Sequence, residues 1–166
     1  MDIKGDIVIR DMDDEDAKRL EEKLRASGNT LSLYQSYLRE TTCEYVTALY
    51  NGELAGFAKL DWQSGYEDFA DRKIPEIKNL WVFEEYRSLG IAHQLMTHLE
   101  KRAARKSEIC GVGVGLSEEF EPAQGLFEKL GYVPDGKGIY YIESNTVQDE
   151  LEVDDNQALM MVKSLS

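Results

Sequence analysis

The chain has 166 residues, of which 42% are hydrophobic, and its 32 acidic against 19 basic side chains give a formal net charge of -13. This length and apolar content predict one folded domain over residues 1–166, and no apolar run reaches the roughly 18 residues that a membrane helix needs. The negative charge argues against nucleic-acid partners, and two cysteines without metal-ligand spacing to the histidines predict a cytoplasmic protein with no metal site.

The first half of the chain alternates apolar periodic segments with turn signals. Residues 14–26 are typical of a helix, because Leu20 and Leu24 mark one buried face and Gly28 follows its end. The dipeptide Asn51-Gly52 predicts a tight hairpin after a strand rich in Tyr, Val and Thr. The elements predicted here are strands at 6–10, 43–50 and 53–62, helices at 14–26 and 31–40, and a polar loop over 63–73.

The second half continues this alternation. Residues 74–82 alternate apolar and polar side chains as a half-buried strand does, and 109–114 is apolar enough to be buried on both faces. The segment 143–155 holds six acidic residues and no basic one, which is typical of a solvated loop or of a lip that attracts amines. The other predicted elements are a loop containing Gly90, a helix at 91–106, a helix from Pro122 to Gly131, and strands at 138–143 and 156–163.

The segment 83–93 combines a strand end, a loop with glycine and a helix start. Helix N-termini leave backbone N–H groups unpaired and carry partial positive charge, so they are suited to bind a diphosphate. Gly90 lets the backbone approach such a ligand, small Ala92 keeps side-chain bulk away from it, and Arg87 adds a positive charge. The segment lacks the three spaced glycines of the dinucleotide fingerprint and the Gly-Lys-Ser/Thr of a Walker loop.

Three motifs within residues 76–132 point to one family. The Arg-x-x-Gly-x-Ala sequence at 87–92 resembles the pyrophosphate loop of the GNAT superfamily of acyl-CoA-dependent N-acetyltransferases. The strand before it, at 76–82, looks like that family's fourth strand. The sequence A-Q-G-L-F-E-K-L-G-Y at 123–132 is similar to the end of the family's last conserved helix. The three motifs stand in the family's order and at its distances.

The resemblance implies a fold and a co-substrate. The fold is α/β (α+β), with a mixed, mostly antiparallel sheet of about six or seven strands flanked by about four helices. Strands 74–82 and 109–114 would splay apart, and the pantetheine of acetyl-CoA would lie in the opening. The N–H of Leu80 would polarise the thioester carbonyl. The cofactor-binding residues implied are Leu80, Trp81, Val82, Arg87, Ser88, Leu89, Gly90, Ile91, Ala92 and His93.

The activity implied is transfer of an acetyl group from acetyl-CoA to a primary amine by direct attack in a ternary complex. An amine with a lysine-like pKa of about 10.4 is protonated at pH 7, so a positioned carboxylate has to take its proton. Glu76 is the catalytic candidate, because it lies as far before Gly90 as the catalytic glutamate does in the histone-acetyltransferase branch of the superfamily. The alternatives are a solvent-facing residue or a carboxylate that only orients substrate.

The acceptor is left open by the sequence. The acidic balance favours a small cationic amine, and a protein lysine or N-terminus is the alternative. The aromatic residues Trp62, Tyr66 and Phe69 either line the acceptor site or pack. The resemblance also admits a homodimer, because many relatives dimerise.

One position departs from the family pattern. Phe127 stands where many small-molecule members have a tyrosine that protonates the leaving thiolate, so it would be a wall of the acyl pocket or plain core. The thiolate leaves unaided, since a thiol pKa is about 8.5, or another group supplies the proton. The departure leaves a non-catalytic acyl-CoA-binding regulatory module as an alternative. A nucleotide-phosphate binder that ignores CoA is a third one.

Overall fold

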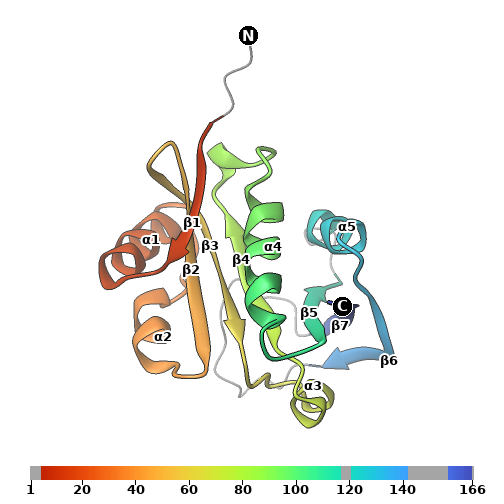
Figure 1. Cartoon of the computed structure of the whole chain (residues 1–166). Coiled ribbons are helices and arrows are strands. Elements are labelled where there is room, and N and C mark those ends of the chain that lie inside the picture. The colour runs from red at the N-terminus through yellow and green to blue at the C-terminus, as the bar shows by residue number, and fades with distance from the viewer. Residues whose placement is uncertain (1–4, 117–120, 142–156, 166) are drawn as a thin grey trace.

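The computed structural model describes residues 5–116, 121–141 and 157–165. Its strands form one sheet in the order β1-β2-β3-β4-β5-β7-β6 (Figure 1). Neighbouring strands are antiparallel except β4 and β5, which are parallel, so the predicted mixed sheet is confirmed. The strands are β1 (Ile7–Asp11), β2 (Cys43–Tyr50), β3 (Glu53–Asp61), β4 (Glu76–Val82), β5 (Ile109–Gly115), β6 (Val133–Tyr141) and β7 (Gln157–Ser164).

The helices cover both faces of the sheet. They are α1 (Asp14–Ala26), α2 (Leu33–Arg39), α3 (Glu67–Arg72), α4 (Ile91–Ala103) and α5 (Glu121–Lys129), with a short 3-10 turn η1 (Glu84–Tyr86) before α4. Figure 1 shows α4 running along the middle of the sheet, with α1 and α2 to its left and α5 to its right. Apolar residues of α4 and α5 pack on one face, here called the α4 face. Those of α1, α2 and α3 pack on the other, the α1 face.

Local signals in the sequence explain the best predicted elements. Asp13 caps α1, because its carboxylate accepts the N–H of Asp16 while the Asp16 side chain accepts the N–H of Asp13. The turn after β2 has a positive φ at both Asn51 and Gly52, as a two-residue hairpin turn requires. Helix 14–26 and strand 43–50 are therefore confirmed residue for residue.

The segment 63–73, predicted as a loop, contains α3. This prediction was wrong because the helix depends on tertiary packing rather than on an apolar stripe. Phe69 is fully buried, and its ring fills the space that a side chain at Gly111 would occupy. Strand β6 also begins earlier than predicted, at Val133, and is irregular between Pro134 and Ile139. The acidic segment 143–155 lies outside the described residues.

Strands β4 and β5 pair over a very short length. Glu76 lies opposite Gly111 and Ile77 opposite Val112, and among the described residues these are the only register pairs between the two strands. A bulge follows in β4, where Asn79 has a φ of 57° and the register with β3 shifts. The predicted divergence of these strands is thus observed, and we call the space beyond Ile77 the β4–β5 opening.

Candidate active site

The backbone of β4 presents hydrogen-bonding groups to the β4–β5 opening. The N–H of Phe83 donates to the carbonyl of Ala55 in β3 at 2.9 Å. Because successive residues of a strand direct their backbone groups to opposite sides, the N–H groups of Leu80 and Val82 point away from β3 and toward β5. The opening therefore has donors suited to an extended ligand.

The loop before α4 exposes a second set of donors. Ser88 and Gly90 both have left-handed backbones, with φ of 65° and 87°, and Gly90 is the N-cap of α4. The first main-chain bond of the helix runs from the N–H of Gln94 to the carbonyl of Gly90, at 3.1 Å. The N–H groups of residues 91–93 have no helix carbonyl before them. With the helix dipole, these N–H groups are suited to bind an anion.

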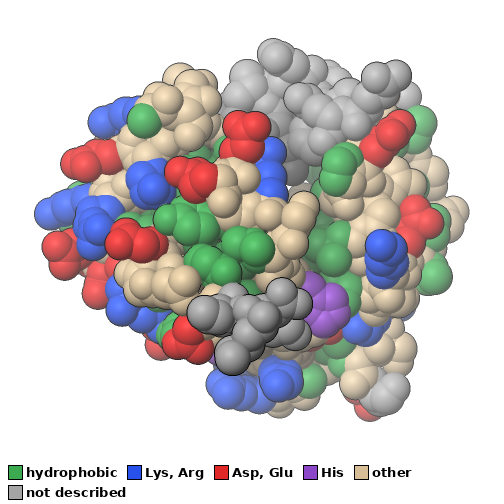
Figure 2. Space-filling view, turned by 90° about the horizontal axis from the view of Figure 1, so that it is seen from above, with side chains coloured by type: hydrophobic (Ala, Val, Ile, Leu, Met, Phe, Trp, Pro, Cys, Tyr) green, Lys and Arg blue, Asp and Glu red, His purple; other side chains and the backbone are tan. Residues whose placement is uncertain are grey.

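A groove of about 530 Å³ joins this loop to α5 on the α4 face. Its lining, as far as the described residues show it, contains Arg87, Lys129 and His93 and no acidic side chain, in a chain with a net charge of -13. Figure 2 looks down on the molecule and shows hydrophobic side chains gathered between basic and acidic ones. The groove is lined by Val82, Tyr86, Arg87, Ser88, Gly90, Ile91, Ala92, His93, Pro122, Gly125, Leu126 and Lys129.

The α5 wall of this groove was missed in the sequence analysis. It consists of Pro122, Gly125, Leu126 and Lys129. Gly125 was the available signal, because a glycine inside a helix carries a conformational cost and often marks a close approach. A side chain at Gly125 would meet no atom within 4 Å, so its absence widens the groove.

Three predicted cofactor-binding residues have side chains outside the groove lining. Leu80 packs against the core of the α4 face, and Leu89 is 42% exposed. Trp81 packs on the opposite, α1 face, where the Arg87 guanidinium lies 5.3 Å from its ring centre. For Leu80 and Trp81, any contact with a ligand in the opening is therefore through the backbone.

Glu76 lies on the α1 face at the closed end of the opening. Glu76 is 6% exposed, and its Oε1 accepts a hydrogen bond of 2.6 Å from the hydroxyl of Ser64. Burial raises the pKa of the Glu76 carboxyl, while Lys78 and the Ser64 hydroxyl oppose that rise. A carboxyl whose pKa is raised is better able to hold a proton at neutral pH, as a general base must.

The aromatic residues whose roles the sequence left open lie against other side chains of the protein. Phe127 is 5% exposed in the core of the α4 face, with its ring 5.9 Å from that of Tyr132. The rings of Tyr66 and Phe69 pack edge to face at 4.8 Å on the α1 face. Trp62 donates its indole N–H to Glu44 at 2.7 Å.

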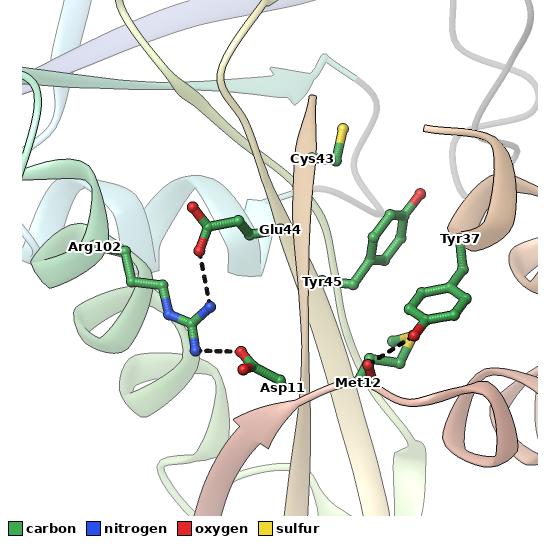
Figure 3. Close-up of a pocket in the computed structure, with 7 residues that line it drawn as sticks. All are labelled: Asp11, Met12, Tyr37, Cys43, Glu44, Tyr45 and Arg102. Carbon is green, nitrogen blue, oxygen red and sulfur yellow. Dashed lines mark hydrogen bonds and ion pairs between the residues drawn. The ribbon is translucent and has the colours of Figure 1, made fainter. Parts of the chain in front are cut away.

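A second hollow, of about 270 Å³, lies at the end of β1 and the beginning of β2 and is drawn in Figure 3. Arg102 of α4 joins Asp11 at 2.6 Å and Glu44 at 2.9 Å, so both carboxylates of this hollow are already paired with the guanidinium. Burial raises the pKa of the Cys43 thiol to about 12, which excludes a thiolate nucleophile near neutral pH. We interpret this hollow as a junction between α4 and the sheet edge.

Residues 5–116, 121–141 and 157–165 contain no group of three or more potential metal ligands. No helix in the same residues is long and apolar enough to span a membrane.

The chain is similar to known acetyltransferases. The sequence profile of the acetyltransferase (GNAT) family matches residues 9–132. No curated protein sequence matches the chain significantly. Among solved structures, the ribosomal-protein-S18-alanine N-acetyltransferase of Escherichia coli superposes with a TM-score of 0.69 at 17% identity, over 97% of this chain and 95% of that one.

Two other solved structures show the same fold. An aminoglycoside 6'-acetyltransferase of type Ii gives a TM-score of 0.66 at 22% identity, over 96% of this chain and 97% of that one. A candidate acetyltransferase from Salmonella typhimurium, solved with its cofactor acetyl-CoA, gives 0.67 at 16% identity, over 96% and 94%. The chain thus belongs to the acetyltransferase (GNAT) family, and its class of activity is acyl transfer.

Proposed function

We propose that this protein transfers an acetyl group from acetyl-CoA to a primary amine of a small, cationic acceptor. The observation that carries the proposal is the β4–β5 opening, which lies between the groove on the α4 face and Glu76 on the α1 face. A thioester that entered from the groove would meet an amine arriving from the side of Glu76.

The donors of the groove match the parts of CoA. The free N–H groups of residues 91–93 and the positive side chain of Lys129 suit its phosphates. The N–H groups of Leu80 and Val82 suit the amides of an extended pantetheine arm. The N–H of Leu80 would also stabilise negative charge on the thioester oxygen.

The proposed reaction is direct and needs no covalent enzyme intermediate. Glu76, directly or through water, accepts a proton from the ammonium form of the acceptor. The neutral nitrogen then attacks the thioester carbon, so that a C–N bond forms and the C–S bond breaks. CoA leaves as a thiolate, which is tolerable because a thiol pKa is about 8.5. The second proton of the nitrogen passes to solvent.

The choice of a small cationic acceptor rests on charge. With a net charge of -13 the protein attracts cations over its surface. One structural neighbour acetylates aminoglycosides and another an alanine of a ribosomal protein, so both acceptor classes occur on this fold. The proposed compartment is the cytoplasm, in which the free thiols of Cys43 and Cys110 would persist.

The test is a transfer assay with a panel of amines. The purified protein is incubated with acetyl-CoA and polyamines, aminoglycosides or peptides, and both released thiol and acetylated product are measured. We expect product with the polycationic small amines. Product with peptides alone would overturn the small-acceptor assignment. Thermal stabilisation by acetyl-CoA without product on any amine would favour the non-catalytic binding module.

A further inference from the structure

A serine outside the family motifs holds the carboxyl of Glu76. Ser64 lies in the segment between β3 and α3, 12 residues before Glu76, and it is only 6% exposed. Its Oγ is 2.6 Å from Oε1 of Glu76 and 3.0 Å from the backbone nitrogen of Tyr66. The serine therefore has two partners, both buried.

The direction of these two hydrogen bonds follows from the donors available. The backbone N–H of Tyr66 can only donate, so Ser64 Oγ is its acceptor. A serine hydroxyl has a single proton, and Ser64 donates it to Oε1 of Glu76. Accepting this hydrogen bond makes Oε1 less basic than Oε2, so a proton arriving at the carboxylate binds preferentially at Oε2.

The other oxygen faces the beginning of the β4–β5 opening. Oε2 lies 3.6 Å from the position that a Cβ would take at Gly113. Gly113 is the first residue of β5 beyond Val112, the last residue that pairs with β4. Because residue 113 has no side chain, β5 places only its backbone beside Oε2 at the point where the strands separate, and the thioether of Met160 in β7 borders the same space.

We propose that Ser64 is a positioning residue that reserves Oε2 of Glu76 as the oxygen that takes the proton from the acceptor amine. This inference rests on the proposed role of Glu76 as the base. The bond that breaks is N–H of the ammonium, the bond that forms is O–H at Oε2, and the Ser64 hydroxyl keeps its own proton throughout.

The charges around Glu76 set the sign of the expected effects. Lys78 on β4 and Lys59 on β3 favour the ionised carboxylate, Asp61 on β3 disfavours it, and the described residues of β5 and β7 next to it contribute Gly113 and Met160. The Ser64 hydroxyl also favours the ionised form, since it donates to the carboxylate. Removal of the hydroxyl therefore raises the pKa of Glu76 further.

The first test is Ser64→Ala, read by titration of the Glu76 side-chain carboxyl in a carbon-13-labelled protein. We expect its titration to move to higher pH, and the acidic limb of the kcat profile to move with it. The KM for acetyl-CoA should not change. Ser36→Ala is the matched control, because Ser36 is equally buried on α2 but lies away from Glu76. An unchanged Glu76 titration in Ser64→Ala would overturn the proposal.

Two more variants keep the test decisive if Ser64→Ala unfolds. Ser64→Thr retains the hydroxyl and should restore the wild-type pH profile. Gly113→Ala leaves Ser64 in place and adds a methyl group against Oε2, with Met160 shifting by a few tenths of an ångström. It should lower kcat several-fold at all pH values, and an unaltered kcat would contradict the role of Oε2.

Failure of the base assignment has a different signature. If Glu76→Gln were fully active, Glu76 would not be the base. The carbon-13 titration would still report whether Ser64 controls the carboxyl. The two hypotheses can therefore fail separately.

Discussion

The two sides of the β4–β5 opening are built from different groups. On the α4 face, the proposed anion site consists of the consecutive backbone N–H groups of residues 91–93 at the start of α4. On the α1 face, Glu76 is held by side chains and backbone from β4, from the segment at Ser64 to Tyr66, and from β5 at Gly113. The first arrangement is local in sequence, and the second exists only in the folded chain.

Because of this difference, the two sides of the opening should respond to different kinds of substitution. A backbone site depends on backbone conformation and on small side chains, so it is blocked by added bulk or added charge. A side-chain site depends on one functional group and on the partners that set its pKa. Substitutions on the α4 face should therefore change acetyl-CoA affinity, whereas those on the α1 face should change turnover and its pH dependence.

The largest expected effect is that of Glu76→Gln. The amide keeps the size of the side chain and an acceptor for the Ser64 hydroxyl, but it cannot take a proton. We expect kcat to fall by about 10² to 10⁴ at pH 7, the range of general-base catalysis, with acetyl-CoA affinity unchanged. Steady-state kinetics with a saturating amine measure this loss. A fall in acetyl-CoA affinity would mean that the two sides of the opening are not independent.

Ala92→Glu should act on the other side only. Ala92 lines the groove at the start of α4, and a carboxylate there would repel the phosphates of CoA. Two unit charges 4 Å apart near a protein surface interact by about 4 kcal/mol, so a loss of affinity of up to about a thousandfold is expected. Isothermal titration with acetyl-CoA is the measurement.

Gln94→Glu is the matched control for Ala92→Glu. It adds the same charge to the first turns of α4, but Gln94 is exposed and lies outside the groove lining. Neither variant should unfold, because acidic residues stabilise a helix N-terminus. Equal losses of affinity in both variants would show that overall charge, and not contact in the groove, controls binding.

The same division explains what could be predicted from sequence. The Arg87–Ala92 loop could be singled out because its motif consists of consecutive residues, and several of these residues line the groove. The α5 wall was missed because Pro122, Gly125 and Leu126 reach the groove only through the packing of α5. Ser64 could not be singled out from the sequence, because a single serine in a polar segment is part of no motif or periodic pattern. Helix α3 was missed for a similar reason, because Phe69 packs against Gly111 of β5, a contact that forms only in the folded chain.

The buried carboxyl of Glu76 should also affect how the stability of the protein depends on pH. The pKa of Glu76 is raised above its ordinary 4.5, so between that value and the raised one the folded state holds more protons than the unfolded state. Stability therefore falls as pH rises through this window. Glu76→Gln removes the titration, and its melting temperature should exceed that of the wild type increasingly from pH 4 to pH 8.

Melting curves across pH check this sign. Glu22→Gln, which alters an exposed carboxylate on α1, should shift the melting temperature little at any pH. A Glu76→Gln variant less stable than the wild type at pH 8 would mean that Lys78 and Ser64 overcompensate the burial of the charge.

Phe127→Tyr has the smallest expected effect and separates the two roles of this position. The ring is 5% exposed and packs against Tyr132, whose own hydroxyl already donates to Glu100 at 2.8 Å. A buried hydroxyl without a partner costs about 1–3 kcal/mol, and each kcal/mol lowers the melting temperature of a domain of this size by about 2–4 °C. We expect this loss of stability and no gain in kcat.

A gain in kcat with unchanged stability would contradict this core position. It would mean that the ring edge meets the reacting sulfur, where a phenol can supply the proton that the wild-type chain lacks at residue 127. Without such a gain, departure of the thiolate depends on its own stability. Acyl donors with more acidic thiols should then have a higher kcat than acetyl-CoA when both are saturating. Such a difference would come from the leaving group and not from an acid on the enzyme.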